Sequence, residues 1–257
     1  MLTSNPFAEL SAYIPSVVTE TFIVVMFALV VVGTLFDVIH KKSAKYFFED
    51  WKKSKSKGTN EVGGGQVMSM AVKTLASEVL TSSEFCSARR RIAHLLTMYG
   101  FVGYVVATAV MVFCYPTSDG PAVWPMMWHI GALMVCVGGY WFWFFIRVDV
   151  AAEGNPILSI SQADLFILSL LASTTWALVW SWLGMSIAGW VAFGLYVFST
   201  TVLFGSIPWP KFAHMFFKPS AALQKRVSEA SGSRSNLPAP ADKPETFGSA
   251  REMPTNY

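Results

Sequence analysis

The sequence contains five runs of mainly apolar residues, each long enough to cross a lipid bilayer as an α-helix. They cover residues 21–39, 92–115, 124–146, 164–183 and 187–207. A helix needs about 20 apolar residues to span the hydrocarbon core, and it satisfies its own backbone hydrogen bonds there. Charged residues make up only 14% of the 257 residues, whereas a soluble domain carries about 25%. The sequence therefore predicts an all-α integral membrane protein with five transmembrane helices.

The lysines and arginines indicate how these helices are oriented. With five spans, all 19 cationic residues fall on one side: eleven in 40–91, one at Arg147 and seven after residue 208. The opposite side comprises segments 1–20, 116–123 and 184–186, which contain none. Because cytoplasmic loops are enriched in Lys and Arg, we expect segment 1–20 to be periplasmic. Helix 21–39 then leads into a basic cytoplasmic loop at 40–91. The four helices of 92–207 follow, and the tail 208–257 is cytoplasmic.

Two parts of the basic loop have distinct patterns. Residues 41–58 interleave lysines with Tyr46, Phe47, Phe48 and Trp51, which suits either an interfacial anchor on anionic headgroups or a docking surface for an acidic protein. Residues 67–80 predict an amphipathic helix lying on the membrane or on a partner. Its apolar face comprises Met68, Ala71, Val72, Leu75 and Val79.

The tail 228–257 is rich in Pro, Ser and Ala and nearly devoid of large apolar residues. Such a segment cannot bury enough surface to fold alone. It is therefore either a disordered end or a segment that wraps a partner subunit.

Histidines are the main candidates for chemistry, because the three cysteines, Cys86, Cys114 and Cys136, show no metal-binding spacing. His94 follows Arg91 by three residues, and His214 follows Lys211 by three. Both are therefore expected near the cytoplasmic boundary at similar depth. Two histidines so placed could be the axial ligands of a b-type haem, or they could be ordinary interfacial residues. His40, at the same boundary, could replace either one. His129 is expected at the outer end, as an interfacial residue or a proton-handling group for a quinone.

Two segments resemble a known superfamily. RRRIAHLLTMYGF at 89–101 resembles the second helix of the cytochrome b-like anchors of the nitrate reductase gamma and heterodisulfide reductase type. IPWPKFAHMFFKPSAALQKRV at 207–227 resembles their fifth helix. Within that superfamily, nearly the whole chain is similar to the membrane anchors of dissimilatory adenylylsulfate reductase. The similar segments include DVIHKKSAKYFF, EFCSARRRIAHLLTMYGF, WHIGALMVCVGGYWFWFFIRVDVAAEGN, ADLFILSLLAS and SNLPAPADKPETFGSAREMP.

The resemblance implies a subunit of the inner (cytoplasmic) membrane that holds two soluble partners, a flavoprotein and an iron–sulfur subunit. These would oxidise sulfite and AMP to adenylylsulfate and pass electrons to quinone. His94 and His214 match the cytoplasmic haem-ligand pair of the superfamily, whereas Tyr104 and Tyr196 stand at its second pair. One haem is therefore expected, and the alternative is a haem-free docking subunit.

The resemblance predicts no catalytic residue in this chain and no nucleic-acid partner. A transporter is disfavoured, because no inverted repeat and few intramembrane charges occur. The cations expected to dock the soluble partners are Lys41, Lys42, Lys45, Lys211, Lys218, Lys225 and Arg226.

Overall fold

The structure is a computed structural model that describes residues 2–40, 42–83, 85, 87–147, 160, 164–205 and 209–233. For residues 43, 44, 50, 54, 55 and 209–216 it describes the backbone alone. The chain divides into two compact units, 1–37 with 89–213 and 38–88 with 214–257, and each is described by itself.

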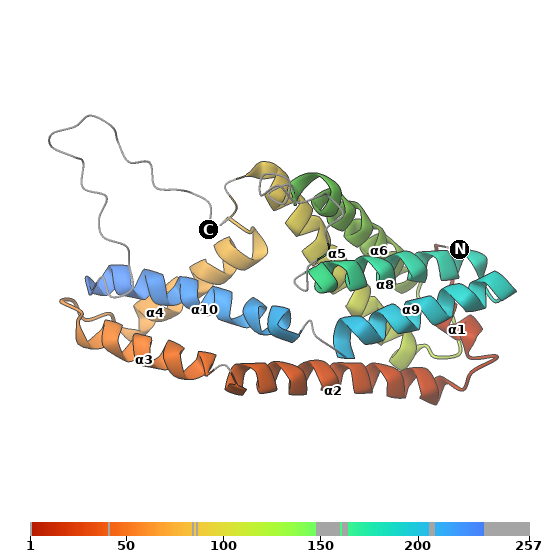
Figure 1. The fold of residues 1–257 in the computed structure, drawn as a ribbon, viewed down its shortest axis with the longest axis horizontal. Helices are drawn as coiled ribbons and strands as arrows, with labels where there is room; N and C mark the ends of the chain where they lie inside the picture. The colour runs from red at the N-terminus through yellow and green to blue at the C-terminus, as the bar shows by residue number, and fades with distance from the viewer. Residues whose placement is uncertain are drawn as a thin grey trace. The chain divides into compact units, whose positions relative to one another are not determined.

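All the described elements are helices (Figure 1). In chain order they are α1 (Pro6–Leu10), α2 (Ser16–His40), α3 (Ser43–Ser56), α4 (Gly64–Thr74), the π-helix η1 (Leu75–Leu80), α5 (Ala88–Cys114), α6 (Val123–Trp141), the π-helix η2 (Phe142–Ile146), α8 (Leu165–Leu183), α9 (Ile187–Gly205) and α10 (Trp209–Ser231).

The five predicted spans are confirmed as helices long and apolar enough to cross a membrane. They are α2, α5, α6 continued by η2, α8 and α9. The observed α2 begins five residues earlier than predicted and α5 begins four residues earlier, whereas α9 is described as far as Gly205 and residues 206 and 207 lie outside the described part. The protein is thus a multi-pass membrane protein whose spans form the first unit.

Glycines bring α5 and α6 into backbone contact. A Cβ atom built on Gly131 would lie 2.7 Å from the carbonyl oxygen of Gly100, and one on Gly138 would lie 2.7 Å from that of Ala93. Both distances are shorter than real Cβ contacts, so only glycine fits at these positions. Small residues of this kind are how transmembrane helices achieve close packing.

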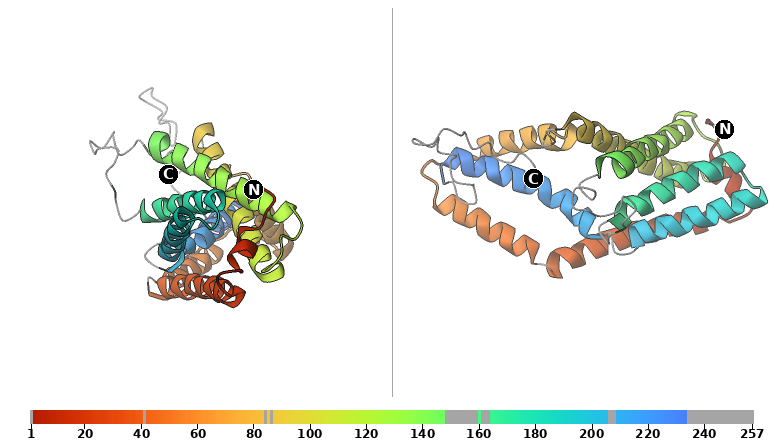
Figure 2. Two further views of the ribbon diagram at one scale, coloured as in Figure 1. Left: turned by 90° about the vertical axis from the view of Figure 1, so that its right-hand side faces the viewer. Right: turned by 45° about the horizontal axis from the view of Figure 1, so that its top comes forward.

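Helices α8 and α9 form an antiparallel hairpin (Figures 1 and 2). Gly184 ends α8 with a φ of +58°, which glycine adopts without steric cost. Within the hairpin, the hydroxyl groups of Ser173 and Thr200 form a buried hydrogen bond of 2.8 Å. An ion pair also connects α8 to η2. Arg147 directly follows η2, and it pairs with Asp164, which directly precedes α8. The Arg147 guanidinium also lies 3.9 Å above the ring of Trp143.

A short helix that the sequence analysis did not predict, α1, is fixed to the loop between α5 and α6. Asn5 is fully buried, and its side-chain amide donates to the carbonyls of Tyr115 at 2.9 Å and Ser118 at 3.1 Å. Its backbone N–H donates to a carboxylate oxygen of Asp119 at 2.9 Å. The Asn5 side-chain oxygen accepts from the N–H of Phe7 at 3.0 Å, and so caps α1. An Asn followed by Pro6 is a helix-start signal.

The second unit joins α10 to the α4–η1 segment and to the loop before it. Arg226 of α10 donates to Glu78 at 2.9 Å and to Ser77 at 2.8 Å. The N–H groups of Thr59 and Asn60 donate to the carbonyl of Ser231 at 2.8 and 3.0 Å. The predicted helix at 67–80 is confirmed as α4 and η1. The non-folding tail was expected from residue 228, but α10 continues to Ser231, and residues 234–257 lie outside the described part.

The glycine contact predicts that Gly131→Ala will destabilise the first unit, because the added methyl group would meet backbone rather than a movable side chain. Gly194→Ala is the matched control, since nothing lies within 4 Å of a Cβ atom at that position. We expect Gly131→Ala to lower the thermal unfolding midpoint in detergent by several degrees, and Gly194→Ala to leave it unchanged or raise it. Equal midpoints for both variants would contradict the close α5–α6 contact.

Candidate functional site

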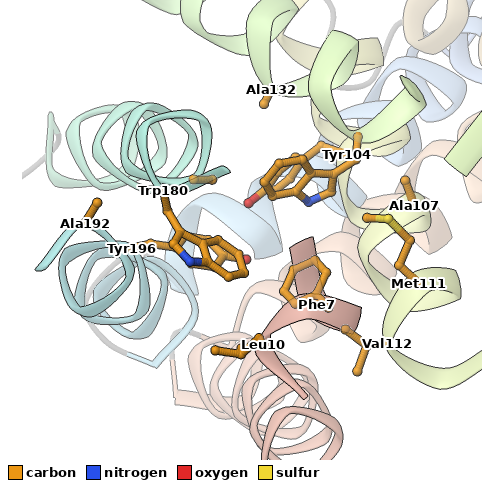
Figure 3. Close-up of a cluster of buried hydrophobic side chains, with 12 residues drawn as sticks. Phe7, Leu10, Tyr104, Ala107, Met111, Val112, Ala132, Trp180, Ala192 and Tyr196 are labelled. Atoms are coloured by element: carbon orange, nitrogen blue, oxygen red, sulfur yellow. The ribbon is translucent and has the colours of Figure 1, made fainter. Parts of the chain in front are cut away.

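Five aromatic side chains from five helices fill the centre of the first unit (Figure 3). Tyr104 of α5 stacks on Trp128 of α6 with 5.4 Å between ring centroids. Tyr196 of α9 stacks on Trp180 of α8 at 5.8 Å. Phe7 of α1 meets both tryptophans edge-on, at 5.9 and 5.4 Å. We call these five residues the aromatic core; none is more than 6% exposed.

The two tyrosine hydroxyl groups point into the same region between the helices (Figure 3). They interact with each other, Tyr104 also with Ser173, and Tyr196 also with Thr200. The Tyr104 oxygen nevertheless has no hydrogen-bond partner of ordinary geometry. Tyr104 therefore contributes through its ring more than through its hydroxyl group.

Trp128 and the adjacent His129 make polar contacts with other helices. The indole N–H of Trp128 donates to the Thr108 hydroxyl oxygen on α5 at 3.0 Å. His129 is 7% exposed, and its Nδ1 lies 2.7 Å from the carbonyl oxygen of Pro125. A carbonyl only accepts, so Nδ1 carries the proton, and Nε2 of the neutral ring accepts from the Ser181 hydroxyl at 2.7 Å. His129 was expected at the outer end of its helix, as an interfacial residue or a proton-handling group; it lies near the start of α6, where it bridges α6 and α8 and is buried among the helices.

The aromatic core also bears on the second haem position of the resembling superfamily. The resemblance would align Tyr104 and Tyr196 with that position, and each ring is in stacking contact with a tryptophan. Phe7 packs against both tryptophans and so occupies the space between the two stacks. A porphyrin macrocycle does not fit between rings that already touch, so these residues do not suit a haem.

The two predicted haem ligands belong to different units. His94 lies on α5 in the first unit, is exposed, and is ten residues from Tyr104. An exposed imidazole is accessible to an iron atom, so this position suits an axial ligand. His214 lies on α10 in the second unit, and its side chain is outside the described residues. The pairing of His94 with His214 therefore stays a prediction. The substitute ligand His40 is exposed at the last position of α2.

The predicted docking cations differ in what surrounds them. Lys42, Lys45, Lys218 and Lys225 are exposed. Lys45 makes only a surface pair with Glu49 at 3.7 Å, and the Lys218 ammonium lies 5.5 Å from the centre of the Phe85 ring. Arg226 is half-buried, and its guanidinium group forms an ion pair with Glu78 of the same chain. Lys41 and the side chain of Lys211 are outside the described residues.

The polar contacts predict opposite results for two substitutions one helical turn apart on α5. Thr108→Val leaves the buried indole N–H of Trp128 without an acceptor, and should cost about 1 kcal/mol of stability. Tyr104→Phe removes a hydroxyl group without a hydrogen-bond partner and keeps the stacked ring. It should be neutral or slightly stabilising. Thermal unfolding in detergent measures both. A loss in Tyr104→Phe as large as that in Thr108→Val would show that the hydroxyl group is satisfied.

Comparison with known proteins adds no assignment to this geometry. No protein family matches the sequence, and no curated protein or solved structure is significantly similar to it.

Proposed function

We propose that this chain is the inner-membrane anchor and electron conduit of a cytoplasmic adenylylsulfate reductase. The proposal rests on the resemblance described in the sequence analysis, which includes the segment around His94 and the tail, and on the five helices that could span a membrane. In this proposal the flavoprotein and iron–sulfur subunits dock on the basic side of the membrane. The two electrons released when sulfite is oxidised and joined to AMP as adenylylsulfate then pass to quinone.

The distribution of charge supports the proposed orientation. With the observed helix bounds, segments 2–15, 115–122 and 184–186 still contain no Lys or Arg, and all 19 cations fall at the other end of the spans. The positive-inside rule places that end in the cytoplasm. The N-terminus is then periplasmic, and the second unit faces the compartment in which the soluble subunits would lie.

We assign one b-type haem to the proposal, with His94 and His214 as axial ligands. A haem at this boundary would carry single electrons between an iron–sulfur cluster of the partner and quinone. The chain's own contribution is to hold two imidazoles from α5 and α10 toward one iron. The alternative is a haem-free anchor that only docks the reductase beside a quinone site.

A visible spectrum of the purified, dithionite-reduced protein distinguishes these two forms. If the conduit is correct, the protein shows a b-type α-band that is lost in both His94→Ala and His214→Ala. The matched control is His40→Ala, which removes another exposed histidine of the same end and should keep the band. A colourless folded protein from haem-producing cells would leave the haem-free anchor. Loss of the band in His40→Ala with retention in His94→Ala would reassign the ligand.

Docking is tested by two neighbouring residues of α10 that differ in pairing. Lys225 is exposed, so Lys225→Gln should weaken capture of the soluble subunits and make that capture less sensitive to salt. Arg226 is paired with Glu78, so Arg226→Gln should instead lower the thermal stability of the second unit. Capture measured in rising salt, together with unfolding midpoints, separates the two effects. Capture that is unchanged in Lys225→Gln and in a variant that also lacks Lys218 would contradict electrostatic docking on α10.

A further inference from the structure

We propose that α3 is an interfacial helix that binds the anionic headgroups of the same bilayer that α2 crosses. This inference is independent of the reductase, because it rests on α2, α3 and their connection alone. The sequence left two occupants open for this segment, a lipid surface and an acidic protein. The covalent geometry and the exposed side chains favour the lipid surface.

The connection between the two helices fixes the start of α3 near the membrane surface. Helix α2 has 25 residues, so at 1.5 Å per residue it is about 37 Å long and reaches the headgroup region on both sides. Only Lys41 and Lys42 separate His40 from Ser43. Two residues span about 7 Å at most, so α3 begins at the depth at which α2 leaves the hydrocarbon.

Lys42, between α2 and α3, has an unusual backbone conformation. Its φ is +54°, in the left-handed region, and its N–H donates to the carbonyl of Ile39 at 3.1 Å. A residue in this conformation at the end of a helix closes the last turn and sends the chain away from the helix axis. Its own carbonyl accepts from the N–H of Tyr46 at 3.1 Å and so starts α3. The helical hydrogen bonding of α2 therefore stops before Lys42 and begins again in α3.

Three of the four aromatic side chains of α3 lie together. Phe47 contacts Phe48 with 5.6 Å between ring centroids and Trp51 with 6.0 Å. Phe48 is 61% exposed, although it is among the most apolar residues of the helix. Aromatic side chains of this kind are enriched at the boundary between headgroups and acyl chains. A lipid surface would cover Phe48 without any further protein.

The cations of α3 supply the charge complementarity. The exposed ones of the described segment are Lys42, Lys45, Lys52, Lys53 and Lys57. From residue 41 to residue 57 the sequence has seven lysines against Glu49 and Asp50. The pair between Lys45 and Glu49 is solvent-exposed and 3.7 Å long, so it neutralises little. A basic helix with one aromatic face is the pattern of peripheral anchors on anionic leaflets.

Site-directed spin labelling of the full-length protein in vesicles tests the proposal. One label replaces Phe48 and another replaces Lys53 on the polar side, in a background whose native cysteines are serine. In phosphatidylcholine vesicles containing phosphatidylglycerol, the label at 48 should collide with oxygen several-fold more, relative to a soluble nickel chelate, than the label at 53. Replacing Lys42, Lys45, Lys52 and Lys53 with Gln should reduce this contrast at position 48 to the level seen in pure phosphatidylcholine.

Two outcomes would overturn the proposal. The first is equal accessibility of both labels to the nickel chelate whatever the lipid composition. The second is a label at 48 that becomes protected only when the soluble reductase subunits are added, which would assign the aromatic face to a protein. Because neither readout measures enzyme activity or haem, a failure of the proposed reductase function would leave this result unaffected.

Discussion

Close contact between helix backbones is the constraint on which the membrane unit depends. Lipid tails are as apolar as leucine, so burial of apolar side chains adds little to helix association in a bilayer. The glycines of α5 and α6 let the two backbones approach so closely that a Cβ atom built on Gly131 would lie 2.7 Å from the carbonyl oxygen of Gly100. Such a close approach creates many dispersion contacts between the helices. Polar pairs then fix the register of the packed helices. The Ser173–Thr200 pair, the Trp128–Thr108 pair and the His129–Ser181 pair each join two different helices.

The five spans were predictable because length and hydropathy alone define them. Their bounds were less accurate: α2 starts at Ser16, where polar residues alternate with valines, and helical structure continues past the apolar run. The second unit was predicted only in part. The amphipathic pattern at 67–80 indicated a helix but not its partner. Its polar edge, through Glu78, pairs with Arg226, 148 residues away in the chain. A contact at such separation leaves no local signal.

The aromatic core shows where sequence reasoning about the site stopped. Tryptophans near helix ends are typical of an aromatic belt at the membrane surface, and Trp182 is 70% exposed. Trp128 and Trp180 are fully buried instead. An exposed and a buried tryptophan occur in similar local sequences. Only the packing of α5, α6, α8 and α9 determines which tryptophans are buried.

The aromatic core also limits where electrons could travel through this protein. Tyr104 precedes the end of α5 at Cys114 by ten residues, so it lies about 15 Å from that end, near the middle of a bilayer. Between Tyr104 and the end of the bundle at Cys114, the stacked rings and α1 occupy the centre of the bundle. In the proposed orientation this is the periplasmic half. His94 lies about 15 Å further along α5 in the opposite direction. Under the proposed function, a haem held by His94 would therefore lie on the side of the aromatic core away from α1.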